Sequence, residues 1–231
     1  MKRINEFFEV SDDCVFKLIS EMELEVYEET ARAVKAGAVV KCMTSWANAH
    51  AMASGATAIA LVSGSKAKAL ADGAVAEAWH SNAAAEACVR GSKAVAMKAG
   101  AVAKALVRGT VAAADENGAV AEAMACGAES IAFADGAVAR ALVDGAFARA
   151  CENGSVAQAL ADGAIACADE NGAVAEAMES GAIAEALADG AKASAMVAGS
   201  KAKAMESGAI AEALADGAIA EALVDGAITK S

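Results

Sequence analysis

A glycine recurs every nine residues through most of this chain, and this spacing constrains the fold more than any other feature. Of the twenty positions in this phase between Gly55 and Gly226, nineteen are Gly and one is Asn82. After Gly, Asn is among the residues that best tolerate a left-handed backbone. We therefore predict that these positions are turn residues with positive φ. The predicted turn residues include Gly55, Gly64, Gly73, Asn82, Gly136 and Gly226.

Within each unit, counted from Gly as position one, constant and variable positions alternate. Position two is Ala, Ser or Thr, and positions four and six are almost always Ala. Positions three and five vary freely, as Lys66 and Lys68 in one unit and Val75 and Glu77 in the next show. A period of two is typical of a strand with one packed and one exposed face. Position seven is mostly Leu or Met, and we expect it to fill the end of the core.

An α-helix is the competing fold, because Ala, Glu, Leu and Met are strong helix formers. Nine residues make two and a half helical turns, so successive glycines would lie on opposite faces. Each glycine would also cost about 1 kcal/mol relative to Ala. The sequence therefore predicts an all-β protein, a parallel β-solenoid with two nine-residue units per coil and about eleven coils. At ~4.8 Å per coil the rod would be about 50 Å long.

The chain is predicted to have two parts, an acidic helical cap over residues 1–35 and an Ala/Gly-rich β-solenoid over residues 36–231. Ser11-Asp12-Asp13 offers a helix N-cap, and apolar residues follow at helical spacing. These residues are Val15, Leu18, Ile19, Met22 and Val26. A cap would cover the strand edges that an open solenoid end exposes. No cap is visible at the C-terminus, so we expect the last coil to pair end to end or to meet a partner.

The charge and the cysteines indicate where such a protein works. The net charge is −12, and residues 1–30 contribute −6, from nine acids and three bases. No basic stripe is visible, which disfavours direct contact with nucleic acid. No apolar signal segment or membrane span is recognised. The six cysteines lack metal or disulfide spacing, so we expect free thiols in a cytoplasmic protein that does not contact a membrane.

Alternate units stack on the same face, so position five predicts two different faces. One face carries opposite charges one coil apart, in the order His50, Lys68, Glu86, Lys104, Glu122, Arg140, Gln158 and Glu176. The other is apolar through its middle, and we predict an interface with a protein partner there, most simply that of a two-fold homodimer. Its residues are Ile59, Val95, Val111, Ala113, Ile131, Phe147, Ile165, Cys167 and Ile183. The alternative is that Val and Ile occur there only because they favour strands.

No motif predicts catalysis, a cofactor or a metal. Three corners, at residues 115–117, 151–153 and 169–171, are rich in carboxylates and end in Asn before Gly, which is turn chemistry more than cation binding. His50 and His80 lie thirty residues apart and are expected to be solvated. We therefore expect a protein that is not an enzyme.

Two resemblances are partial. Gly-Ser-Lys-Ala-Lys-Ala, at residues 64–69 and again at 199–204, resembles small-residue coils in the heads of trimeric autotransporter adhesins. An acidic solenoid with small interior residues is similar in shape to pentapeptide-repeat proteins. Some of those imitate DNA and occupy the DNA site of topoisomerases. The five-residue period is absent here, so this second resemblance concerns shape alone.

Two functions follow as expectations. The first is a non-catalytic binding protein that presents a rigid face to a protein partner. The more specific version of this function is an acidic DNA mimic, of phage or mobile-element type, that inhibits a nucleic-acid enzyme. The alternative is a structural protein that polymerises or pairs through its faces and its C-terminal coil.

Overall fold

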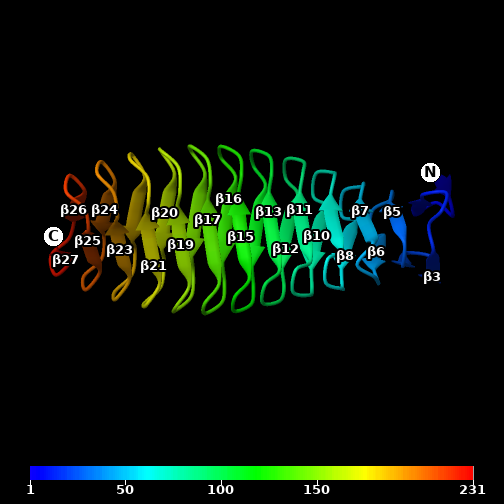
Figure 1. Ribbon diagram of the computed structural model, residues 1–231, viewed down its shortest axis with the longest axis horizontal. Coiled ribbons are helices and arrows are strands. Elements are labelled where there is room, and N and C mark those ends of the chain that lie inside the picture. The colour runs from blue at the N-terminus through cyan, green and yellow to red at the C-terminus, as the bar shows by residue number, and fades with distance from the viewer. Residues whose placement is uncertain (231) are drawn as a thin grey trace.

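The computed structural model describes residues 1–230 and shows a rod of about 12 stacked coils, with the two ends of the chain at opposite ends of the rod (Figure 1). This confirms the predicted parallel β-solenoid. Strands pair with the strand 18 residues further along, as Val75 does with Lys93, so each coil holds two nine-residue units. No helix occurs within residues 1–230.

The strands form two sheets, which we call sheet A and sheet B. Sheet A has 14 strands, in the order β1-β2-β5-β7 and then every odd-numbered strand to β27. Sheet B has 13 strands, which run from β3 and β4 through the even-numbered strands to β26. The strands of sheet A are β1 (Lys2–Arg3), β2 (Phe8–Val10), β5 (Glu29–Ala33), β7 (Ala47–Ala51), β9 (Lys66–Ala69), β11 (Ala84–Ala87), β13 (Val102–Ala105), β15 (Val120–Ala123), β17 (Val138–Ala141), β19 (Val156–Ala159), β21 (Val174–Ala177), β23 (Lys192–Ala195), β25 (Ile210–Ala213) and β27 (Ile228–Lys230). The strands of sheet B are β3 (Phe16–Ser20), β4 (Glu23–Val26), β6 (Val39–Cys42), β8 (Thr57–Ala60), β10 (Val75–Ala78), β12 (Lys93–Ala96), β14 (Val111–Ala114), β16 (Glu129–Ala132), β18 (Phe147–Ala150), β20 (Ile165–Ala168), β22 (Ile183–Ala186), β24 (Lys201–Ala204) and β26 (Ile219–Ala222).

Most corners between strands are β-turns built around the repeated glycine, whose place is taken by Asn82 in one corner and by Trp46, without positive φ, in another. Ala74 N donates to Ala71 O at 3.1 Å, which places Gly73, with φ of 69°, at the third position of the turn. A type II turn requires positive φ there. The corners also bond to one another, since Gly55 N donates to Gly73 O at 3.2 Å. The predicted turn residues have φ of 72° (Gly55), 81° (Gly64), 69° (Gly73), 60° (Asn82), 68° (Gly136) and 86° (Gly226).

The core between the sheets consists almost entirely of alanine. Positions two, four and six point inward, and their alanines have no exposed surface through most of the rod. The sheets lie so close that Ser130 Oγ, on sheet B, is 3.0 Å from the carbonyl oxygen of Arg140 on sheet A. Methyl-sized side chains therefore set the separation of the sheets.

Position seven does not fill the end of the core, contrary to our expectation. Its side chains lie outside, with exposed fractions of 37% at Met52, 39% at Met124 and 57% at Leu214. The reason is the strand alternation itself: position six points inward, so position seven points outward.

The predicted N-terminal helix is wrong, because two antiparallel strands cover the first coil instead. Strand β2 pairs with β5 at the edge of sheet A, and β3 pairs with β4 at the edge of sheet B. A strand satisfies the open backbone groups of a sheet edge, which a helix cannot do. The large side chains of Phe8, Val10 and Leu24 close the core with at most 1% exposure.

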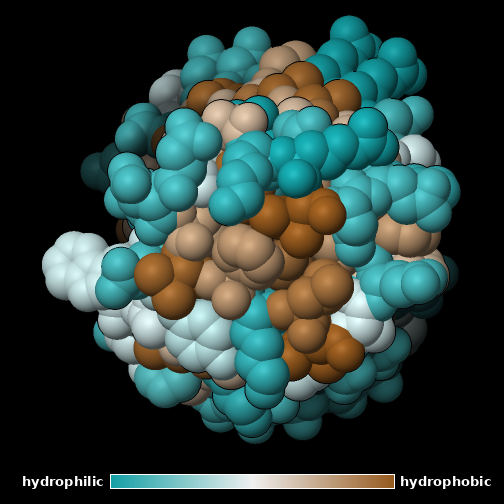
Figure 2. Space-filling view, turned by 90° about the vertical axis from the view of Figure 1, so that its right-hand side faces the viewer, coloured by the Kyte–Doolittle hydropathy of each residue, from teal (hydrophilic) through white to brown (hydrophobic). Residues whose placement is uncertain are grey.

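Four of the residues at helical spacing are on the surface of this cap. Val15, Leu18, Ile19 and Met22 are 43–50% exposed, while Val26 is buried. Figure 2 looks onto this end of the rod and shows apolar surface at its centre. The first parallel coil is formed by β4 and β5, within the segment expected to be the cap.

The corners form two edges along the rod. Edge 1 consists of the corners that follow strands of sheet B, such as residues 115–118, and edge 2 of those that follow strands of sheet A, such as residues 124–127. At the far end, Leu214 and Leu223 are more than half exposed.

Candidate functional site: the outer face of sheet B

Sheet B brings the predicted interface residues into two neighbouring columns. Ile59, Val95, Ala113, Ile131 and Cys167 lie in the position-five column, in which Val95, Ala113 and Ile131 are on consecutive strands. Val111, Phe147, Ile165 and Ile183 lie in the position-three column, in which the last three are consecutive.

The exposure of these residues is uneven. Ala113 is fully buried and Val95 is 5% exposed, so neither offers much surface. Phe147 is 42% exposed. Phe133, which the sequence analysis did not single out, is 44% exposed and follows Ile131 by two residues, in the edge 1 corner directly after β16. The sequence did mark Phe133, because an aromatic residue stands there at position seven, where Leu or Met is usual.

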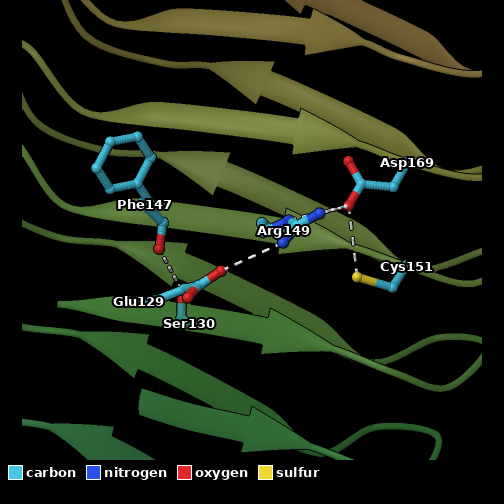
Figure 3. A network of polar contacts seen from close by, with 6 residues as sticks. All are labelled: Glu129, Ser130, Phe147, Arg149, Cys151 and Asp169. Carbon is cyan, nitrogen blue, oxygen red and sulfur yellow. Dashed lines mark hydrogen bonds and ion pairs between the residues drawn. The ribbon is translucent and has the colours of Figure 1, made fainter. Parts of the chain in front are cut away.

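A polar cluster divides the apolar surface in two (Figure 3). Arg149 stands between Ile131 and Cys167 in register, and its guanidinium donates to Asp169 Oδ2 from Nη2 at 2.6 Å and from Nε at 2.9 Å. Its Nη1 is 3.6 Å from Glu129 Oε1. The face therefore presents apolar groups on both sides of one internally neutralised arginine.

The cysteines beside this cluster are not set up as nucleophiles. Burial, with the charge of Asp169 as the next cause, raises the pKa of Cys151 to about 11. Burial, followed by the charges of Glu185 and Asp169, raises the pKa of Cys167 to about 12. Both thiols are thus protonated at neutral pH, and the thiolate is the reactive form.

Edge 1 borders this face and carries a row of carboxylates. In the seven corners from residue 115 to residue 226 there is no Lys or Arg, and each corner has one exposed acid. These are Glu116, Asp135, Glu152, Glu170, Asp189, Glu206 and Asp225. None of the seven forms an ion pair within residues 1–230. The corners at residues 115–117, 151–153 and 169–171, which we interpreted from the sequence as polar turns, are thus part of a continuous acidic edge.

The outer face of sheet A carries the charge ladder. Lys68 Nζ is 2.8 Å from Glu86 Oε2, and Glu122 lies between Lys104, at 3.5 Å, and Arg140, at 3.8 Å. Beside this ladder runs a column that the sequence analysis missed, with a half-buried valine on five consecutive strands. These are Val102, Val120, Val138, Val156 and Val174.

His50 is half-buried and not solvated, contrary to our expectation. Burial, followed by the adjacent charges of Arg32 and Lys68, lowers the pKa of His50 to about 4. Both neighbours are its register partners on β5 and β9. His80 is exposed at a corner.

Shallow hollows on the surface include one of about 340 Å³ beside Trp79 and His80 and one of about 350 Å³ along residues 213–218. In the part of the chain that the structure describes, no three His, Cys, Asp or Glu side chains are grouped to hold a metal ion. That part also contains no helix long and apolar enough to cross a membrane.

No family model matches the chain, and no curated protein does. A solved structure, a TibC-catalysed hyper-glycosylated TibA fragment, is similar over 91% of this chain and 95% of its own, at 13% sequence identity and a TM-score of 0.36. This similarity extends no further than an elongated β-helical shape. No likeness to pentapeptide-repeat proteins was found.

Proposed function

We propose that this chain is a non-catalytic binding protein, and that the outer face of sheet B with edge 1 beside it binds a protein partner of complementary charge. The single observation that carries the proposal is the exposure of Phe133, at edge 1, and of Phe147, on the adjacent strand β18 of this face. The chain has five phenylalanines, and the other three lie in the N-terminal cap. Exposed aromatic side chains are typical anchors of protein interfaces.

The charges beside Phe133 favour a basic partner. Phe133 lies in an edge 1 corner, and on this edge Asp135 and Glu152 are exposed and unpaired within residues 1–230. An apolar centre with a charged rim gives both affinity and selection of partner. A partner that matches it presents an apolar patch bordered by Lys and Arg.

Enzymes that act on nucleic acids have such basic surfaces, so we infer that the partner belongs to this class. The rod would occupy the surface that otherwise binds the phosphate backbone. The thin alanine core and the hydrogen-bonded corners support this function, because a stiff rod loses little conformational entropy on binding.

The test compares two matched double variants in affinity capture from the source cells. Phe133→Ser/Phe147→Ser removes the two rings of sheet B, and Val138→Ser/Val156→Ser removes comparable apolar groups from sheet A. We expect a protein that is retained by the wild type and by the sheet A variant, lost with the sheet B variant, and released by duplex DNA at constant ionic strength.

Equal retention by the two variants would contradict an interface on sheet B. Retention that depends on Phe133 and Phe147 but is indifferent to DNA would contradict the nucleic-acid enzyme as partner.

A further inference from the structure

Edge 2 differs from edge 1 in having an apolar ridge along its whole length. Position seven is apolar in ten consecutive corners, and position eight is apolar in most of them. The position-seven residues are Met52, Leu70, Cys88, Leu106, Met124, Leu142, Leu160, Met178, Met196 and Leu214. At the centre of the ridge, Val107 is 38% and Met124 39% exposed.

Position nine of the same edge carries charges in a particular order. Arg90 and Arg108 are followed, one coil apart each, by Cys126, Asp144 and Asp162, and all five are exposed. None of the four charged side chains forms an ion pair within residues 1–230, whereas Arg140 and Arg149 on the sheets are both paired. These five consecutive corners of edge 2 therefore offer two free cations and two free anions at equal spacing on either side of one cysteine, whereas the exposed acids Asp72, Glu179 and Asp216 lie in corners outside this set.

We propose that edge 2 is the interface between two copies of this chain, which lie antiparallel about a two-fold axis at Cys126. That axis sets Arg108 opposite Asp144 of the second copy and Arg90 opposite Asp162 of the second copy, and symmetry repeats both pairs. It also sets Leu106 opposite Leu142 and brings the two Met124 side chains together. In an isologous interface the same patch must complement itself, and this charge order does so.

The order of charges selects one register. Moving the axis by half a coil toward the N-terminus would place Asp72 opposite Asp162, and parallel copies would place each arginine opposite its own counterpart. Only the antiparallel arrangement centred on Cys126 pairs all four charges with opposite charges. Five charged or thiol-bearing corners in this sequence therefore favour a second copy over an unrelated protein.

The size of the contact predicts a reversible dimer. Ten corners at ~4.8 Å make a ridge of about 45 Å. A band about 10–15 Å wide along it buries roughly 1,000 Å² in total, the lower end for specific interfaces. Since exposed charges contribute to it, association should weaken as salt rises.

The test is a charge exchange followed by sedimentation equilibrium at low salt. Arg108→Asp places like charges opposite each other twice, and we expect the dissociation constant to rise about tenfold or more. Arg108→Asp/Asp144→Arg exchanges the two charges at the net charge of the wild type, and should return the constant to within about threefold of the wild-type value. Both residue types already occur at position nine, so the turn tolerates them.

Cross-linking through Cys126 gives a second test of the proposed interface. A short bis-maleimide should join two copies of the wild type and should not join Cys126→Ser. Ile131→Lys, on sheet B, is the control for the other face and should leave the dimer intact.

A monomeric wild type, a charge exchange that fails to restore association, or loss of the dimer in Ile131→Lys would each overturn the edge 2 interface. The last result would assign self-association to sheet B, and the capture experiment with the two serine variants tests sheet B independently.

Discussion

At most corners the glycine lies against the side chain that precedes the glycine of the coil before. A Cβ added at Gly136 would be 2.7 Å from Asn117 Oδ1, whereas a Cβ at Gly55 would meet no atom within 4 Å. The two positions have nearly the same φ, 68° and 72°. They therefore separate the need for a left-handed backbone from the need for space.

This pair predicts how substitutions at the turn behave. Gly55→Ala should cost roughly 1 kcal/mol from backbone strain, and Gly55→Asn clearly less. Gly136→Asn should recover less of the loss, because Asn117 must move. Urea denaturation measures both, and Asn117→Ala as a background should make Gly136 behave like Gly55. Equal recovery by Asn at both positions in the wild-type background would contradict the role of Asn117.

His50 predicts a dependence of stability on pH. The pKa of His50 is about 4 in the folded protein and 6.5 in its ordinary state. The unfolded chain therefore binds the proton first, so the contribution of His50 is complete above about pH 6.5 and is lost as the pH falls toward 4. The loss should be about 1–3 kcal/mol for this half-buried group. His50→Gln should flatten thermal stability between pH 6.5 and 5, and an unchanged slope would contradict this.

At the scale of the element, the N-terminal cap holds the large buried side chains that the rest of the rod lacks. Phe8 is fully buried at the end of an alanine core. Phe8→Ala should cost about 3–5 kcal/mol, the usual range for a buried phenylalanine. Phe133→Ala removes an exposed ring and should change the free energy of unfolding by less than about 1 kcal/mol. Chemical denaturation of both variants checks this, and similar losses would show that the cap does not close the core.

The cap is also where the sequence misled us. Val15, Leu18, Ile19 and Met22 have helical spacing, yet they are exposed. Phe8 and Val10, and Leu24 and Val26, alternate with period two and are buried. Each of these strands is only three or four residues long, so the period is seen once and cannot outweigh a longer helical pattern. The segment forms strands and not a helix because β2 and β3 pair with the open strand edges of the first coil.

At the scale of the whole molecule, repetition is what made the solenoid predictable. Each of about twenty units repeats the same inward alanines and the same turn, so every unit supports the same inference. The stacking of position five into two columns followed from the period. The content of the edges did not follow, because position seven was expected to fill the end of the core and the residue before each Gly was interpreted as turn chemistry, so neither position was considered as a column along the rod. The neighbours of corner side chains such as Phe133 and Arg108 can be identified only when corners 18 residues apart are stacked on one another.

The 18-residue coil makes this molecule sensitive to the parity of its units. Removing two consecutive units from the middle would shorten the rod by one coil and leave every later residue on its own side. Removing one unit would carry every later strand to the opposite sheet, although the alanine core would fit as well as before. Asp135 and its acidic successors would then follow Arg108 on edge 2. Loss of one nine-residue unit should therefore leave folding and stability unchanged but exchange the residues of the two faces and of the two edges beyond the deletion. Intact function thus restricts the number of units much more strictly than an intact fold does.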